Sequence, residues 1–261
     1  MTSHRRALLI GINYEGTPSA LGGCHNDVAQ LSGMLKQHFG YESSDITRLI
    51  EKQATRTNIL KALSDLVIEC ERDRVTECWF SFSGHGVGVH DKNADERDKR
   101  DECIVTVDHQ LIHDDAIHKI IRRLPKYTRR VMVWDCCFSG TGGDLPYRYI
   151  YGNKSVLENP EALMRGNIIM ISGCRDDQTS ADAWGLDKQK KFTGAMSSAL
   201  RLTLKKYEYD VTVYKLISGM RTYLKDHRFK QVPQITSTQK FSSTSVFCTD
   251  VDKKPYLHAH K

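Results

Sequence analysis

Short apolar runs of strand length alternate along this chain with segments of helical period. The run at 6–12 (RALLIGI) is followed at 25–39 by a segment whose apolar side chains recur every three or four residues. The alternation continues with helical segments at 55–70, 114–124, 194–207 and 212–226, and with apolar runs at 78–84, 130–137, 167–174 and 245–250. Strands that alternate with helices form a mostly parallel sheet with both faces covered. The pattern therefore predicts an α/β fold with a central, mainly parallel sheet and helices on both faces.

Two stretches break this alternation. Residues 91–102 (DKNADERDKRDE) carry six acidic and four basic side chains, and residues 139–165 contain glycines, prolines and tyrosines without a period. Both are predicted to be exposed loops. No segment rich in proline, glycine or serine separates domains, so we expect a single domain over residues 1–261.

Composition excludes several classes of protein. The net charge of +6 is a small excess of 38 basic over 32 acidic residues, without a basic block, and so predicts no nucleic-acid partner. No apolar run approaches the roughly 18 residues needed to cross a bilayer, and no leader with a cleavage site begins the chain, so we expect a cytoplasmic protein without a membrane partner. The eight cysteines are scattered, which favours reduced thiols, one of which can act as a nucleophile.

Reactive side chains follow two of the predicted strands. One apolar run ends in SGHG (83–86) and another in DCC (135–137). Reactive groups gather beyond the carboxyl ends of parallel strands, where a cysteine and a histidine can form a thiolate–imidazolium pair. One alternative is that the cysteines are core residues and the histidine caps a turn. Another is that the three side chains bind zinc, although the C-x-x-C pair typical of zinc sites is missing. The residues alone do not choose between Cys136 and Cys137.

Seven segments resemble, in order, the successive blocks of a metacaspase. They are LIGINYEGTPSALGGCHNDV (9–28), FSGHG (82–86), DECIVTVD (101–108), DDAIH (114–118), DCCFSG (135–140), ISGCRDDQTSADA (171–183) and PQITS (233–237). The separation of His85 from Cys137 also resembles that of caspase-like cysteine peptidases, about 50 residues. The resemblance is to type I members without a long N-terminal pro-region. It implies a caspase-like α/β/α sandwich with a large-subunit-like part at about 1–147, a loop at 148–165, a small-subunit-like part at 166–250 and a tail at 251–261.

The resemblance implies a role for each residue of the two strand ends. His85 is the general base and Cys137 the nucleophile, while Cys136 is a neighbour whose side chain points the other way, as adjacent residues do in extended chain. The backbone N–H groups of Gly86 and Cys137 are candidates for an oxyanion hole.

The resemblance also implies cleavage of proteins or peptides after Arg or Lys. Asp27 and Asp135 match the carboxylates of the specificity pocket, and Cys24 and Ser83 match its lining. The charges agree, because a guanidinium in a partly dehydrated pocket needs paired carboxylates. The alternative is that Asp27 caps or solvates the helix at 25–39.

Metacaspases are commonly activated by calcium, which takes six to eight oxygen ligands. Asp101, Asp114, Asp115 and Asp144 match the family's ligand positions, so the resemblance implies Ca²⁺ as an activator and no organic cofactor. The alternative is that Asp114 caps the helix that follows and Asp115 favours its N-terminus, which is compatible with calcium binding.

Three further expectations concern processing, assembly and activity. The loop at 148–165 contains Arg148, Lys154 and Arg165, which are candidates for self-cleavage. We expect a monomer. The alternatives to a peptidase are a catalytically weak or inactive scaffold or quality-control factor of the same family, and a nucleotide binder. The nucleotide binder is disfavoured because neither G-x-x-x-x-G-K-[ST] nor G-x-G-x-x-G follows a strand.

Overall fold

A computed structural model describes residues 4–90, 100–136, 145–150, 154–157, 166–173, 182–184 and 192–247. Its centre is an eight-stranded sheet in the order β2-β1-β3-β7-β10-β13-β8-β9. In that order the strands are Ile46–Ile50, Arg5–Gly11, Glu77–Ser83, Arg129–Asp135, Ile168–Ser172, Gln234–Ser237, Tyr147–Ile150 and Lys154–Leu157. The first five strands in this order, from β2 to β10, pair in parallel. The pairs β10–β13, β13–β8 and β8–β9 are antiparallel. The prediction of a mainly parallel sheet is confirmed.

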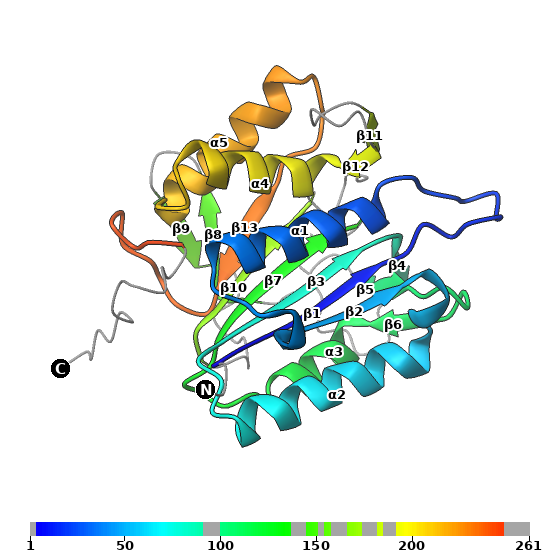
Figure 1. Cartoon of the computed structure of the whole chain (residues 1–261). Helices are drawn as coiled ribbons and strands as arrows, with labels where there is room; N and C mark the ends of the chain where they lie inside the picture. The colour runs from blue at the N-terminus through cyan, green and yellow to red at the C-terminus, as the bar shows by residue number, and fades with distance from the viewer. Residues whose placement is uncertain are drawn as a thin grey trace.

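Helices cover both faces of this sheet (Figure 1). One face carries α1 (Cys24–His38), α4 (Ala195–Lys206) and α5 (Val213–Asp226), and the other carries α2 (Arg56–Arg72) and α3 (Asp114–Ile121). Alternate residues of β1 supply the two cores, because successive side chains of a strand point to opposite faces. Ala7 and Leu9 pack with α1, α4 and α5, whereas Leu8 and Ile10 pack with α2 and α3. The α/β/α sandwich is therefore confirmed.

Smaller elements surround the central sheet. Strands β4 (Gly86–His90), β5 (Arg100–Val105) and β6 (Leu111–His113) form an antiparallel sheet, and β11 (Asp182–Trp184) pairs with β12 (Phe192–Gly194). Two single-turn helices, η1 (Ser43–Asp45) and η2 (Glu51–Gln53), flank β2.

Both predicted loops contain strands, so both predictions are corrected in part. β5 begins at Arg100, inside the segment 91–102, whose residues 91–99 lie outside the described part. Within 139–165, β8 and β9 extend the central sheet, and the hydroxyl of the buried Tyr149 in β8 lies 3.2 Å from that of Ser237 in β13. The stretch at 148–165 is thus not simply a loop between two subunit-like parts.

The strand predicted at 245–250 is also wrong as far as the described chain reaches. Val246 forms a single bridge to Thr212, and no strand includes residues 245–247. The apolar side chain of Phe247 is buried in the core instead, which explains why the sequence resembles a strand there.

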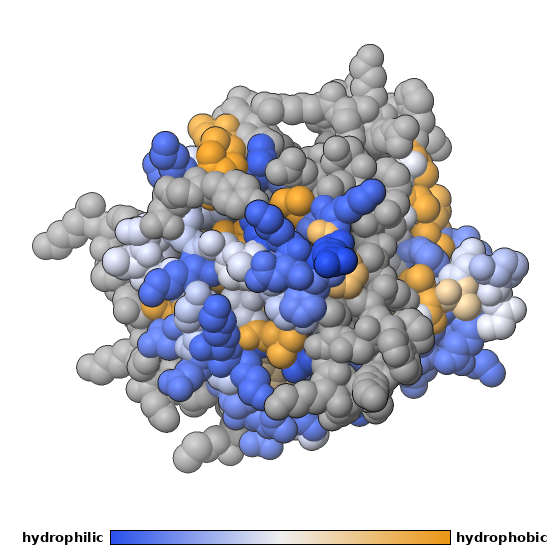
Figure 2. Space-filling view, turned by 90° about the horizontal axis from the view of Figure 1, so that it is seen from above, coloured by the Kyte–Doolittle hydropathy of each residue, from blue (hydrophilic) through white to orange (hydrophobic). Residues whose placement is uncertain are grey.

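The outer face of the α4–α5 layer is polar. Figure 2 shows this face from above, with hydrophilic residues predominating and apolar residues in separate small areas. Exposed lysines lie on both helices, at Lys205, Lys206, Lys215 and Lys225. Among the described helices, none combines the length and the apolar character needed to span a membrane.

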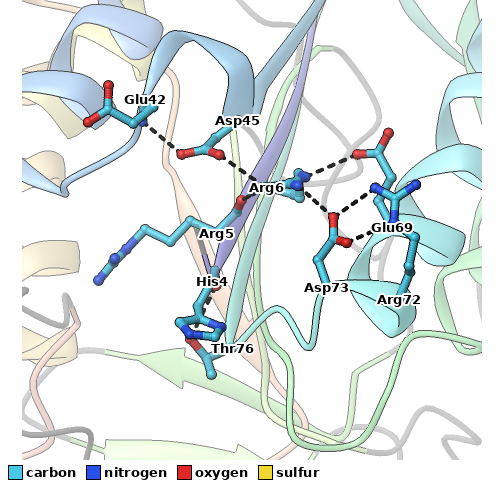
Figure 3. Close-up of polar contacts among 9 residues, drawn as sticks. All are labelled: His4, Arg5, Arg6, Glu42, Asp45, Glu69, Arg72, Asp73 and Thr76. Carbon is cyan, nitrogen blue, oxygen red and sulfur yellow. Dashed lines mark hydrogen bonds and ion pairs between the residues drawn. The ribbon is translucent and has the colours of Figure 1, made fainter. Parts of the chain in front are cut away.

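One guanidinium joins three elements at the amino end of the sheet (Figure 3). Arg6 of β1 lies 3.0 Å from the Asp45 carboxylate, 3.2 Å from that of Glu69 and 2.6 Å from that of Asp73. Asp45 also accepts a hydrogen bond from the Glu42 N–H, which caps η1. Arg6 therefore ties β1 to η1 and to the C-terminal end of α2.

We expect the substitution Arg6→Met to lower the free energy of unfolding by about 3 kcal/mol, because it leaves the buried carboxylate of Asp45 without its counter-charge. Urea unfolding monitored by circular dichroism measures this change. The control is Lys61→Met, which removes an exposed pair with Asp65 and should change stability by at most about 0.5 kcal/mol. Equal losses in the two variants would contradict the role given to Arg6.

Candidate active site

The two predicted reactive segments lie at neighbouring strand ends. β3 and β7 pair in parallel up to Ser83 and Asp135, their last residues, and the Gly84 N–H donates to the Asp135 carbonyl at 3.3 Å. His85 follows one strand and Cys136 the other. Cys136 is 1% exposed and belongs to the core on the α2–α3 face. Cys137, the predicted nucleophile, lies outside the described residues, directly after Cys136 in the chain.

Hydrogen bonds hold both the ring and the backbone of His85. The ring atom Nε2 lies 2.7 Å from the carbonyl oxygen of Ser19. A carbonyl can only accept, so Nε2 carries the proton and Nδ1 is left as the basic nitrogen. The His85 N–H donates to the Tyr14 hydroxyl at 2.9 Å, and its carbonyl accepts from the Val105 N–H at 2.9 Å. The imidazole is therefore presented in one tautomer from a fixed backbone.

Tyr14 packs beneath His85. Their ring centroids are 4.7 Å apart, and the Tyr14 hydroxyl donates to the Val105 carbonyl at 2.7 Å. Burial raises the pKa of Tyr14, so its hydroxyl stays protonated and neutral. A Cβ on Gly84 would lie 2.9 Å from this hydroxyl and 2.8 Å from the Phe82 ring, which explains the glycine that precedes His85.

Sequence reasoning did not single out Tyr14 or Ser19. Both follow the carboxyl end of β1, the location that pointed to the other site residues. That position was the available signal, but Ser19 contributes only a main-chain carbonyl, which every residue carries.

Asp27 and Asp135 converge at the N-terminus of α4. Asp27 accepts from the Ser83 hydroxyl at 2.7 Å and from the Gly194 N–H at 2.9 Å. Asp135 accepts from the Ser197 N–H at 2.9 Å, and the exposed fractions of the two aspartates are 5% and 6%. A helix N-terminus offers unpaired N–H groups and the positive end of the helix dipole, both of which stabilise carboxylates. The structure thus brings three of the predicted pocket residues together.

The fourth predicted pocket residue, Cys24, is buried at the start of α1, where its N–H donates to the Asn13 side chain at 3.0 Å. The N-cap of α1 is Gly23, which makes no side-chain cap. Asp27 lies in the first turn of α1, but its carboxylate accepts hydrogen bonds from Ser83 of β3 and Gly194 of β12, which lie across from the helix. This geometry disfavours the alternative in which Asp27 merely caps α1.

A small, partly open pocket adjoins Asp27 on the α4 side. Its lining is largely apolar and includes a guanidinium: Asp27, Gln30, Leu31, Met34, Val133, Ser197, Leu200 and Arg201. The charge of Arg201 and the apolar walls make this pocket a poor site for a cation.

The remaining catalytic candidate, Gly86, opens β4 directly after His85 and pairs with Ile104 of β5. Its role in an oxyanion hole stays a prediction. The five cysteines that the structure describes are free thiols: Cys24, Cys70, Cys78, Cys103 and Cys136.

The predicted calcium ligands are described only in part. Asp114 is the first residue of α3 and is 3% exposed, and its carboxylate accepts from the N–H of Asp115, which is exposed. The N-cap of α3 is His113, one residue before the cap proposed as the alternative. The backbone of Asp101 lies in β5, while its side chain and all of Asp144 lie outside the described part. No group of three or more His, Cys, Asp or Glu side chains suited to a metal occurs among the described residues.

The candidates for self-cleavage lie in different environments. Arg148 is paired on both sides within the central sheet, opposite Thr236 of β13 and Val156 of β9. Lys154 is exposed at the start of β9, and Arg165 lies outside the described part. Because a peptidase needs an extended, unpaired segment, this placement disfavours Arg148 as a cleavage site.

Comparisons with known proteins identify relatives. Residues 5–146 match the family model described as metacaspase, peptidase C14 domain. Metacaspase-3 of Trypanosoma brucei brucei is 36% identical, with 94% of this chain and 76% of the relative covered. Metacaspase-1 of Scheffersomyces stipitis is 33% identical, with 90% and 71% covered.

Two solved structures share the fold. A crystal structure of a Geobacter sulfurreducens protein has a TM-score of 0.64 at 20% identity, covering 93% of this chain and 98% of that one. The structure of pro-sf-caspase-1 has a TM-score of 0.55 at 13% identity, covering 91% and 88%. These likenesses show that the fold is caspase-like.

The convergence of the two aspartates on α4 can be tested at Gly194. A Cβ there would overlap the Asp135 carboxylate and lie 2.8 Å from that of Asp27, so we expect Gly194→Ala to cost about 1 to 3 kcal/mol of stability. The control is Gly33→Ala in α1, where a Cβ meets nothing within 4 Å. Alanine should stabilise that helix by about 0.5 to 1 kcal/mol. Thermal and urea unfolding measure both changes, and a neutral Gly194→Ala would contradict this arrangement.

Proposed function

Since the chain belongs to the metacaspase family of peptidase C14 proteins, we propose that it is a calcium-stimulated cysteine endopeptidase that cleaves after Arg or Lys. The observation that carries the specificity is the buried pair Asp27 and Asp135. Asp135 ends β7, and Asp27, in the first turn of α1, accepts a hydrogen bond from Ser83, two residues before His85. Two carboxylates at one position suit a substrate cation and repel an acidic side chain.

The proposed reaction begins with proton transfer from the Cys137 thiol to Nδ1 of His85. The thiolate attacks the carbonyl carbon of the scissile bond, and the N–H groups of Gly86 and Cys137 stabilise the oxyanion. The imidazolium then protonates the leaving amine, and a water activated by His85 hydrolyses the acyl-enzyme. The Ser19 carbonyl supports these steps, because it accepts from Nε2–H in both charge states of the ring.

Substrate recognition follows from the charges at the acidic pair. Asp27 and Asp135 already accept hydrogen bonds from Ser83, Gly194 and Ser197, which hold the carboxylates in place before a substrate arrives. A preorganised pair suits the planar guanidinium of Arg, which can bond two carboxylates at once, and accepts the ammonium group of Lys as a point charge.

We propose that calcium is bound by Asp114, Asp115 and Asp144, with Asp101 as a further ligand. Support comes from the donor chemistry, since carboxylate oxygens are the ligands that calcium prefers. Two adjacent carboxylates at the start of α3 also repel each other, and a divalent ion would neutralise them. Because Asp144 follows the nucleophile by only seven residues, binding there would act on the segment that carries Cys137.

We expect Cys137→Ala to abolish cleavage of peptide substrates, and Cys136→Ala to retain most of it, because Cys136 is buried in the core. The measurement is peptidase activity of the two purified variants, with circular dichroism to show that both are folded. Equal losses in two folded variants would remove the nucleophile assignment.

We expect hydrolysis of matched peptides with Arg or Lys before the scissile bond and none of the Asp peptide. Calcium should raise the rates, and magnesium should replace it poorly because it requires strict octahedral geometry.

Asp27→Asn should lower kcat/KM for the Arg peptide. The corresponding activation free energy should rise by about 2 to 4 kcal/mol, as expected when one partner of a desolvated charge pair is lost. Efficient cleavage of the Asp peptide would overturn the proposed specificity. A folded parent protein that cleaves none of the three peptides would favour the alternative of an inactive scaffold.

A further inference from the structure

Glu51 lies outside the proposed catalytic and acidic groups, yet it binds both ends of the loop that contacts His85. It begins η2, directly after β2. One carboxylate oxygen accepts from the Asn13 N–H at 2.7 Å and lies 2.9 Å from Nε2 of His25, and the other accepts from the Glu15 N–H at 2.7 Å. Asn13 and Glu15 stand at the start of the loop between β1 and α1, and His25 follows its end.

The residues of this loop that meet His85 lie between the points that Glu51 holds. Tyr14, flanked by Asn13 and Glu15, accepts the His85 N–H through its hydroxyl. Ser19, farther along the loop, accepts from the His85 ring. Two further bonds fold the loop back on itself, since Asn13 accepts from the N–H groups of Leu21 and Cys24 at 2.7 and 3.0 Å.

The backbone of this cluster is strained. Tyr14 and Glu51 have positive φ values of 52° and 46°, in the left-handed region that side chains other than glycine rarely adopt. Such conformations persist only where surrounding contacts hold them, and they gather at functional sites. The contacts here are the two backbone N–H groups on Glu51 and the Tyr14 hydroxyl bonds.

The Glu51 carboxylate is a strong acceptor at neutral pH. Its side chain is 14% exposed, and burial by itself raises its pKa. Hydrogen bonds from the Glu15 and Asn13 backbones and from His25 outweigh burial, so that the pKa of Glu51 is lowered. The group is therefore ionised, and charge-assisted hydrogen bonds of this kind are stronger than neutral ones.

We propose that Glu51 is a positioning residue for His85, whose carboxylate holds the loop at 13–23 so that Tyr14 and Ser19 meet the imidazole. The proposal rests on the proposed function only in giving His85 the role of base. Its geometric content, one tautomer of His85 maintained through a loop that Glu51 fixes, can be measured without any peptidase activity.

The first test is nuclear magnetic resonance of the His85 ring nitrogens in the 261-residue chain that carries Cys137→Ala. We expect the parent to show the single tautomer with the proton on Nε2. Adding Glu51→Gln places an amide N–H₂ against a backbone N–H donor, so the loop should shift and His85 should populate both tautomers. The control is Asp73→Asn, which removes an ion-paired carboxylate of similar exposure, 12%, at the other end of the sheet. It should leave the tautomer unchanged.

The second test is steady-state kinetics with the Arg peptide in the protein that retains Cys137. Glu51→Gln should lower kcat about 10- to 100-fold and change KM little, because a misplaced base slows chemistry more than binding. Asp73→Asn should lower the unfolding midpoint and leave kcat unchanged. A purely structural role for Glu51 predicts the same pattern for both variants.

The outcomes separate the two proposals. An unchanged His85 tautomer and kcat in folded Glu51→Gln would overturn the positioning role, as would equal kcat losses in the two variants. A parent that cleaves no peptide while its His85 tautomer responds to Glu51→Gln would overturn the peptidase and keep the positioning role. If Glu51→Gln fails to fold, Glu51→Asp takes its place: it keeps the charge but is one methylene shorter, so a smaller shift in the same direction supports the proposal and no shift overturns it.

Discussion

The parallel pairing of β1, β3 and β7 brings three loops to one edge of the sheet. Their register aligns Gly11 with Ser83 and Ser83 with Asp135, so that the three strands end side by side. The loops that follow supply Tyr14 and Ser19, then His85, then the cysteine pair. Because both faces of the sheet are buried by helices, this edge is where polar groups from three distant parts of the chain can meet.

Buried charge at this edge is compensated by main-chain donors. Asp27 and Asp135 accept from N–H groups at the start of α4, and Glu51 accepts from N–H groups at the start of the β1–α1 loop. Such donors cannot rotate away as a lysine or arginine side chain can, so each carboxylate is held in one place. The Ser83, Gly194 and Ser197 donors are uncharged, so they orient the two carboxylates without neutralising them.

Features that depend on side-chain type could be predicted from the sequence, whereas hydrogen bonds made by main-chain atoms could not. Long periodic helices and fully buried strands such as β3 were predicted within a few residues. The alternation of apolar and polar residues is too weak to predict β2, whose burial pattern is mixed. It is also too weak in three strands of only four residues, β8, β9 and β13. His85, Asp27 and Asp135 were found from position and resemblance. The Ser19 carbonyl, and the Asn13 and Glu15 N–H groups that bond to the Glu51 carboxylate, are main-chain atoms of a loop, which every residue type carries.

Arg6 and Glu51 are hubs of opposite charge at opposite ends of the same pair of strands. Arg6 gathers three carboxylates where β1 begins, and Glu51 gathers two backbone N–H groups and an imidazole just beyond the end of β2. At the amino end the partners are structural, so an error in position costs only stability. At the carboxyl end the held loop touches the candidate base, where a displacement of about 1 Å is enough to slow chemistry a hundredfold. The same kind of charged hub therefore has a structural consequence at one edge and a chemical one at the other.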